Sequence, residues 1–80
     1  RLSAFPIPAT DRIFVTGGSN GADIMVELSD LNGRVHPTEW QAATDGLTIY
    51  RAGLPSGTYL LRIVDRNASP RTVRIVFSEP

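Results

Sequence analysis

The sequence lacks cysteine and lysine, has no long apolar run, and contains almost no segment with the pattern of a helix. Without cysteine, neither a disulfide framework nor a thiolate metal site is available, so stability must come from packing alone. No apolar stretch approaches the roughly 20 residues of a membrane-spanning helix. No secretory signal peptide is recognisable either, so an exported protein would carry that signal upstream of this segment.

Net charge is absent as well, because eight arginines balance eight acidic residues. General nucleic-acid binding requires a net positive field, so this class of function is disfavoured. The 80 residues are expected to form a single domain. A chain of this size buries roughly 60% of the surface that its unfolded form exposes, so it can build only one thin core.

The sequence does contain frequent turn signals: six prolines and seven glycines separate short apolar runs, which is typical of an all-β chain. Strands are predicted for residues 12–16, 23–29, 47–51, 57–63 and 71–77. A return strand starting at Arg34 is stopped by Pro37, so it should be short or lie at a sheet edge. About seven strands in a chain of this length predict an antiparallel β-sandwich of immunoglobulin-like type.

Two turns are predicted from local chemistry. Asn32-Gly33 is a strong hairpin signal and predicts a type I′ turn, in which both residues have positive φ. Residues 53–57 predict a second turn, in which Pro55 fixes φ and Gly57 adopts the exit conformation.

The last two strands suggest a register. The pairs that bury both apolar faces are Ile63–Val73, Leu61–Ile75 and Tyr59–Phe77. A slip by one residue would turn one apolar set outward, so it is excluded. The loop then spans residues 66–70.

This register places Arg62 opposite Arg74 on the outward face. Like charges facing across strands destabilise a sheet unless something compensates. Either Glu27 lies beside them, or the two arginines form a docking patch for an anionic surface.

Evidence for catalysis or metal binding is thin. Ser29, Asp30 and His36 could become neighbours across the hairpin, but nothing builds an oxyanion hole beside them. Residues 30–33 resemble the start of a calcium loop but lack its later acidic ligands. Asn67-Ala68-Ser69 matches a glycosylation acceptor and is also ordinary loop chemistry. No catalytic residue, metal site or cofactor is therefore expected.

The single tryptophan, Trp40, is expected to anchor the core, because large aromatic side chains dominate small cores. The alternative is a carbohydrate-binding or adhesive module in which Trp40 and Tyr50 stack on sugars.

Taken together, four segments resemble, in order and spacing, a C-terminal sorting domain of the type IX secretion system of Bacteroidetes (type A group). Residues 5–13 resemble its opening aromatic-Pro-Asn-Pro stretch, and residues 26–34 its strand with an Asp-x-x-Gly-Arg turn. Residues 53–63 resemble its Leu-x-x-Gly-x-Tyr strand, and residues 72–76 its terminal strand. The residues that carry the match are Phe5, Pro6, Pro8, Asp11, Asp30, Gly33, Arg34, Leu54, Gly57 and Tyr59.

The resemblance implies a non-catalytic domain at the end of a larger exported protein. Such domains fold in the periplasm and are recognised by the outer-membrane translocon. A surface sortase then cuts upstream of them and attaches the cargo to anionic lipopolysaccharide. The expected location is the periplasm in transit and then the outer membrane or cell surface.

Two departures from the family pattern stand out. Ile7 stands where the family usually has Asn, and the segment ends Phe77-Ser78-Glu79-Pro80 rather than directly after the last strand. The ending suggests an alternative, an uncleaved docking domain of the secretion machinery.

Sheet edges are open to strand addition by a partner, or by a second copy in a strand-exchanged homodimer. The candidate docking residues are Arg62, Arg74, Val73, Ile75, Val76 and Phe77.

Overall fold

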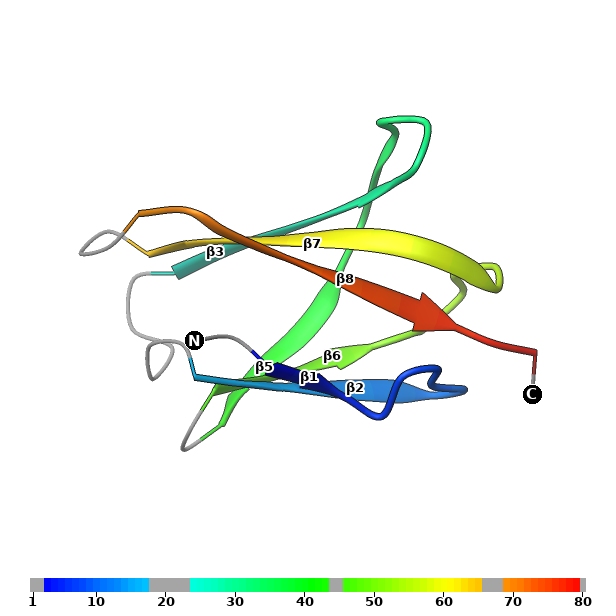
Figure 1. Cartoon of the computed structure of the whole chain (residues 1–80), viewed down its shortest axis with the longest axis horizontal. Coiled ribbons are helices and arrows are strands. Elements are labelled where there is room, and N and C mark those ends of the chain that lie inside the picture. Colours follow the sequence, from blue (N-terminus) through cyan, green and yellow to red (C-terminus); the bar gives the residue numbers. More distant parts are fainter. Residues whose placement is uncertain (1–2, 18–23, 44–45, 66–68, 80) are drawn as a thin grey trace.

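The computed structural model shows two β-sheets packed face to face (Figure 1). The structure describes residues 3–17, 24–43, 46–65 and 69–79. Within these residues there are eight strands and no helix. The strands are β1 (Ser3–Phe5), β2 (Arg12–Thr16), β3 (Ile24–Asp30), β4 (Val35–His36), β5 (Glu39–Ala43), β6 (Gly46–Tyr50), β7 (Gly57–Asp65) and β8 (Arg71–Phe77). The predicted antiparallel β-sandwich is confirmed, with eight strands in place of about seven.

One sheet has the strand order β1-β2-β6-β5 and the other the order β4-β3-β7-β8, and every strand pair is antiparallel. The short edge strand predicted before Pro37 is β4, which has two residues. β1 and β5 were not predicted. β5 lacks an alternating apolar pattern, and it is defined by its pairing with β6 rather than by its own composition.

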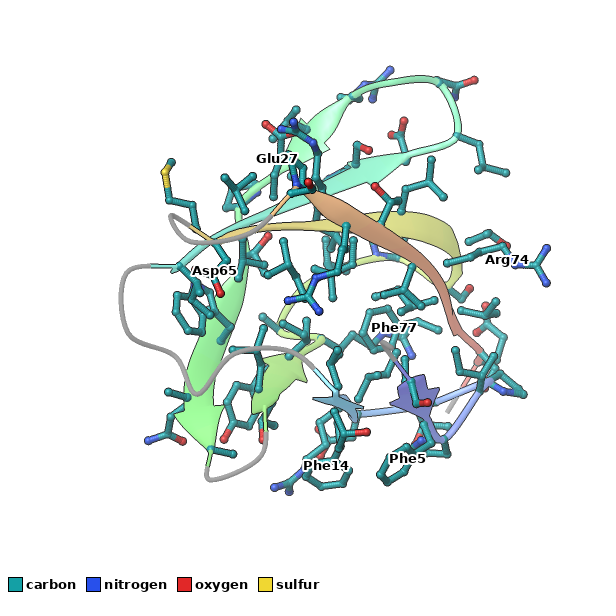
Figure 2. All side chains as sticks on the ribbon, turned by 60° about the vertical axis from the view of Figure 1, so that its left-hand side comes forward. Phe5, Phe14, Glu27, Asp65, Arg74 and Phe77 are labelled. Atoms are coloured by element: carbon teal, nitrogen blue, oxygen red, sulfur yellow. The ribbon has the colours of Figure 1, made fainter. Side chains whose placement is uncertain are left out.

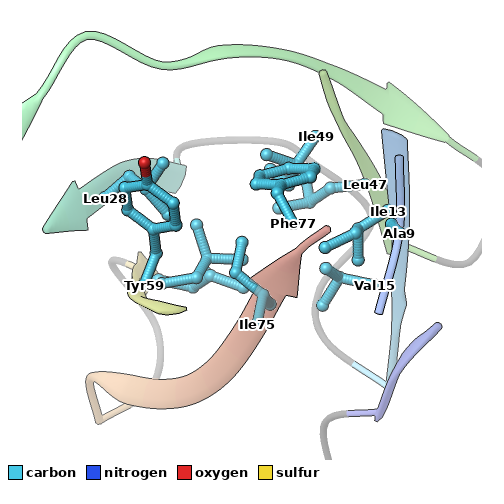
Figure 3. Close-up of a cluster of buried hydrophobic side chains, with 11 residues drawn as sticks. Ala9, Ile13, Val15, Leu28, Leu47, Ile49, Tyr59, Ile75 and Phe77 are labelled. Carbon is cyan, nitrogen blue, oxygen red and sulfur yellow. The ribbon is translucent and has the colours of Figure 1, made fainter. Parts of the chain in front are cut away.

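The core lies between the inner faces of the two sheets (Figure 3). Its buried side chains are Ala9, Ile13, Val15, Leu28, Leu47, Ile49, Tyr59, Leu61, Ile63, Ile75 and Phe77. Ala9 belongs to no named strand, yet its backbone forms a parallel bridge with Phe77 of the opposite sheet. This bridge ties the segment between β1 and β2 to the end of β8.

The predicted register of the closing hairpin is wrong by two residues. The observed pairs are Gly57–Phe77, Tyr59–Ile75, Leu61–Val73 and Ile63–Arg71. A shift by two keeps the same side chains facing inward, so the apolar pattern could not distinguish the two registers. In the observed one, the Phe77 ring lies opposite a glycine and packs against Tyr59, with ring centroids 6.1 Å apart.

The turn between β3 and β4 also differs from the prediction. Gly33 has a φ of 84°, whereas Asn32 does not have a positive φ, so the turn is not type I′. The Gly33 amide donates to the Asp30 carbonyl oxygen at 3.0 Å, and the Asp30 amide donates to the Arg34 carbonyl oxygen at 2.9 Å. The result is a three-residue loop with glycine at its left-handed position.

The Asp30 side chain explains this choice of turn. Its Oδ1 accepts from the backbone amides of Asn32 at 2.9 Å and Arg34 at 3.0 Å. These bonds satisfy the amides of the loop from within, which is the role that Asp commonly has at the first position of a turn.

Candidate docking surface

The outward face of the β4-β3-β7-β8 sheet carries the two arginines that the sequence singled out. Arg62 lies opposite Glu27 on one side and Thr72 on the other. Arg74 lies opposite Leu60, so the predicted juxtaposition of Arg62 and Arg74 is wrong, and the two-residue shift in register is the reason. Figure 2 shows Glu27 and Arg74 well apart on this sheet.

The electrostatic neighbourhoods of the two arginines therefore differ. Glu27 is the cross-strand neighbour of Arg62. This agrees with the expectation that an acidic side chain lies beside one of the arginines. The cross-strand neighbour of Arg74 is apolar, and within the described residues Arg74 forms no ion pair. A guanidinium in this setting keeps its planar set of donors available for a carboxylate or phosphate.

Apolar side chains border these charges. Met25 is 72% exposed, Val35 58% and Leu60 37%. Arginines interspersed with exposed apolar groups resemble the composition of protein interfaces more than that of an ordinary solvated face. We call the set Leu60, Arg62, Arg74 and Val76 the outer docking face.

Three of the predicted docking residues, Val73, Ile75 and Phe77, face the core instead. Ile75 and Phe77 are 0% and 1% exposed and form part of the core, and Val73 packs against it. In the folded domain their side chains stabilise β8 and are not presented to a partner. Val76 is half-buried, and its carbonyl oxygen accepts from the Ala9 amide at 2.9 Å.

Arg51 holds the end of β8, a role that the sequence did not predict. Its guanidinium donates to the carbonyl oxygens of Ser78 at 2.6 Å, Thr10 at 3.0 Å and Leu54 at 3.0 Å. It also lies 5.6 Å from the centroid of the Phe77 ring. Since its polar partners are main-chain carbonyls, no residue type in the sequence marks the site. We call this arrangement the Arg51 clamp.

The family-signature residues of the third segment shape the turn before β7. The Tyr59 hydroxyl donates to the Pro55 carbonyl oxygen at 2.7 Å. Burial raises the pKa of this hydroxyl, with Arg51 opposing and Asp30 adding to the shift, so it remains a donor. Gly57 has a φ of 152°, which an L side chain rarely adopts, and Leu54 packs against the core. This segment is thus a structural signature.

The structure brings Asp30 and His36 together but leaves Ser29 apart from them. His36 Nε2 lies 2.9 Å from Asp30 Oδ2, and the imidazole packs edge-on against Tyr59 with centroids 5.5 Å apart. Successive residues of a strand point to opposite faces, so the Ser29 side chain is directed away from this pair. The described residues also contain no group of three possible metal ligands. The potential glycosylation site at Asn67 lies outside the described residues.

The Asp30–His36 bond makes stability pH-dependent in a defined direction. The His36 side chain, followed by the backbone amide of Arg34, lowers the Asp30 pKa below its ordinary value of 3.8. A carboxylate with a lowered folded-state pKa stabilises the fold above its unfolded pKa, and this contribution is lost as the pH falls through the folded pKa. We expect the excess in melting temperature of wild type over Asp30→Asn to be fully present at pH 6 and to shrink below about pH 4.

Thermal melts at a series of pH values test this expectation. Asp11→Asn is the matched control, because Asp11 is exposed and bonded to the neighbouring Arg12. An Asp30→Asn difference that is the same at pH 6 and pH 2 would show that the carboxylate charge contributes nothing.

Trp40 and Tyr50 do not form a joint platform for sugars. Trp40 is partly buried and packs against the core, whereas Tyr50 pairs with Glu39 on the opposite face of the sheet and donates to Gln41 Oε1 at 3.0 Å. The core role of Trp40 is thus partial, and the two proposed stacking residues point in opposite directions.

Comparison with known proteins completes the description. A family model described as a secretion system C-terminal sorting domain matches residues 3–77. No curated protein and no solved structure matches the chain. In the part of the chain that the structure describes, no helix is long and apolar enough to cross a membrane. The family match spans nearly the whole segment and confirms the resemblance seen in the four motifs. The chain belongs to the family of type IX secretion C-terminal sorting domains.

Proposed function

We propose that this domain directs its parent protein through the periplasm and across the outer membrane, and that a surface sortase then removes it. The family match over residues 3–77 carries the proposal. The fold supports the proposal in two ways. The two sheets of the domain bury a hydrophobic core between them. The arginines and apolar side chains of the outer docking face are left available to a partner. Its work is recognition, without catalysis.

We further propose that the translocon contacts the outer docking face. Arg74 supplies a cation without an acidic cross-strand neighbour, and Leu60 beside it supplies apolar area. Together they suit an acidic patch with an apolar surround on a translocon protein, since charge complementarity guides encounter and apolar contact adds affinity. Arg62 is expected to contribute less, because its cross-strand neighbour Glu27 is acidic, although the two form no ion pair within the described residues.

A reporter fusion tests both proposals. Residues 1–80 are fused to the C-terminus of a periplasmic reporter in a host with an intact type IX system. We expect the wild-type fusion to reach the cell surface and Arg74→Gln to reduce surface reporter several-fold, with Arg62→Gln having the smaller effect. Mass spectrometry of the reporter recovered from the cell surface should show that the whole domain has been removed.

Arg12→Gln is the matched control, because Arg12 is an exposed arginine on the other sheet. Exposed substitutions of this kind change the free energy of unfolding by less than about 0.5 kcal/mol, so a secretion defect would not reflect misfolding. Equal secretion of all variants would exclude the outer docking face and leave sorting intact. A surface reporter that still carries the domain would identify an uncleaved docking module. A wild-type fusion that stays in the periplasm would overturn the proposal that the domain is a sorting signal.

A further inference from the structure

Among the residues that the structure describes, one sheet edge lacks the usual protection against pairing with another strand. β1 and β4 have three and two residues and are each followed by a proline, and the end of β8 is covered by Ala9. β5 has five residues, contains neither proline nor a cationic side chain, and pairs only with β6 among the described strands. In Figure 2 the green ribbon of β5 runs down to an arrowhead at the lower left. The one charged side chain of β5 is that of Glu39, at its first residue. An exposed edge without proline, Lys, Arg or cover is open to a further strand.

The hydrogen-bond groups that β5 presents follow from its neighbours. The Arg51 amide donates to the Asp11 carbonyl oxygen, so this residue directs its backbone groups toward β2. Backbone direction alternates along a strand, so Gly46, Thr48 and Tyr50 direct theirs toward β5. Their partners in β5 point back at β6, which leaves the N–H and C=O groups of Trp40 and Ala42 on the free edge.

We propose that the occupant of this edge is a second copy of the chain, paired antiparallel through β5 about a two-fold axis at Gln41. Trp40 then lies opposite Ala42 of the second copy, and the two residues exchange both backbone hydrogen bonds. Ala42 and Trp40 of the second copy form the same bonds in reverse, so the four free N–H and C=O groups of each copy are all hydrogen-bonded. The two β1-β2-β6-β5 sheets become one continuous sheet.

Side-chain sizes and charges fit this register. The indole of Trp40 is partly buried at the inner side of the sheet and would extend over the small, exposed Ala42 of the other copy. Glu39 would face Ala43, so no like charges oppose each other directly. Gln41 would face its own copy, and a carboxamide can both donate and accept across the axis.

Five residues a side bury less than the about 1,000 Å² typical of stable interfaces, so the dimer is weak and concentration-dependent. Sedimentation of the isolated domain from micromolar to millimolar concentration should show a reversible monomer–dimer equilibrium. Ala42→Pro removes a free-edge N–H without breaking a bond to β6, and it should raise the dissociation constant of the dimer at least tenfold. Thr72→Pro is the matched control, because it removes an outward N–H from β8 and should leave the equilibrium unchanged.

Cross-linking tests the register without a proline. The chain has no cysteine, so a single one introduced by Gln41→Cys would lie beside its own copy. Directly opposed residues of this kind have Cα atoms about 4.5 Å apart, which a disulfide can bridge. Under mild oxidation Gln41→Cys should form covalent dimers rapidly and Glu39→Cys should not. A monomer at millimolar concentration, or equal cross-linking of the two variants, would overturn the proposal.

Discussion

Replacing Gly46 with alanine is expected to destabilise the domain by about 3 kcal/mol or more. A Cβ atom built at this position overlaps the backbone carbonyl of Val15 in the adjacent strand β2. The clash is with main chain, so no side-chain rotation relieves it, and β2 and β6 must move apart. Gly46 is central to its sheet, since it pairs with Thr16 on one side and Ala43 on the other.

The loss should be visible in thermal melts. A domain of this size loses about 4–8 °C of melting temperature per kcal/mol, so a fall of more than about 12 °C is expected. Gly53→Ala is the matched control, because a Cβ there meets nothing within 4 Å. Removing a glycine from such a site should leave stability unchanged or raise it by up to about 1 kcal/mol. Equal melting temperatures for the two variants would show that β2 and β6 do not approach as closely as described.

Replacing Arg51 with methionine is expected to cost about 2–4 kcal/mol, because it removes the Arg51 clamp. Three carbonyl oxygens lose a charged donor, and two of them, on Thr10 and Ser78, lie 68 residues apart in the chain. Methionine retains much of the apolar contact with Phe77, so the loss reports mainly on the hydrogen bonds. The end of β8 should then fray.

Hydrogen exchange locates the effect, since the amides of Ala9 and Ser78 bond across this junction. Both should exchange faster in Arg51→Met, while amides in the middle of β7 change only with global stability. Arg12→Met is the matched control, because Arg12 also lies over an aromatic ring, 5.8 Å from the Tyr50 centroid, but binds no remote carbonyl. If both variants lose the same stability, the carbonyl bonds of Arg51 contribute little.

Because the Arg51 clamp and the outer docking face lie on different sides of β8, we expect mutation to separate folding from the proposed sorting role. Arg51 acts on the backbone at the end of the strand, whereas Arg74 projects from its outward face. A substitution at Arg51 should lower stability and, through it, secretion. A substitution at Arg74 should lower secretion at unchanged stability.

The sequence by itself determined the all-β class, the inward faces of β7 and β8, the family and the short strand before Pro37. Each follows from a local signal, either the alternation of apolar side chains or turn chemistry. Such signals can be read without knowing which strands are neighbours in the fold. Alternation has a period of two, so it fixed the face of Arg62 and Arg74 but left the register open to an even shift.

Only the tertiary structure decided the register, the strand order and the neighbours of each charge. Phe77 lies opposite Gly57, and its ring packs against Tyr59 and under Arg51. This register places Leu60 rather than Arg62 beside Arg74. The sequence of β5 has no alternating apolar pattern, and the segment is a strand because it pairs with β6. The Arg51 clamp binds main-chain carbonyls that every residue carries. Such contacts depend on which segments meet in space, and no residue type records them in advance.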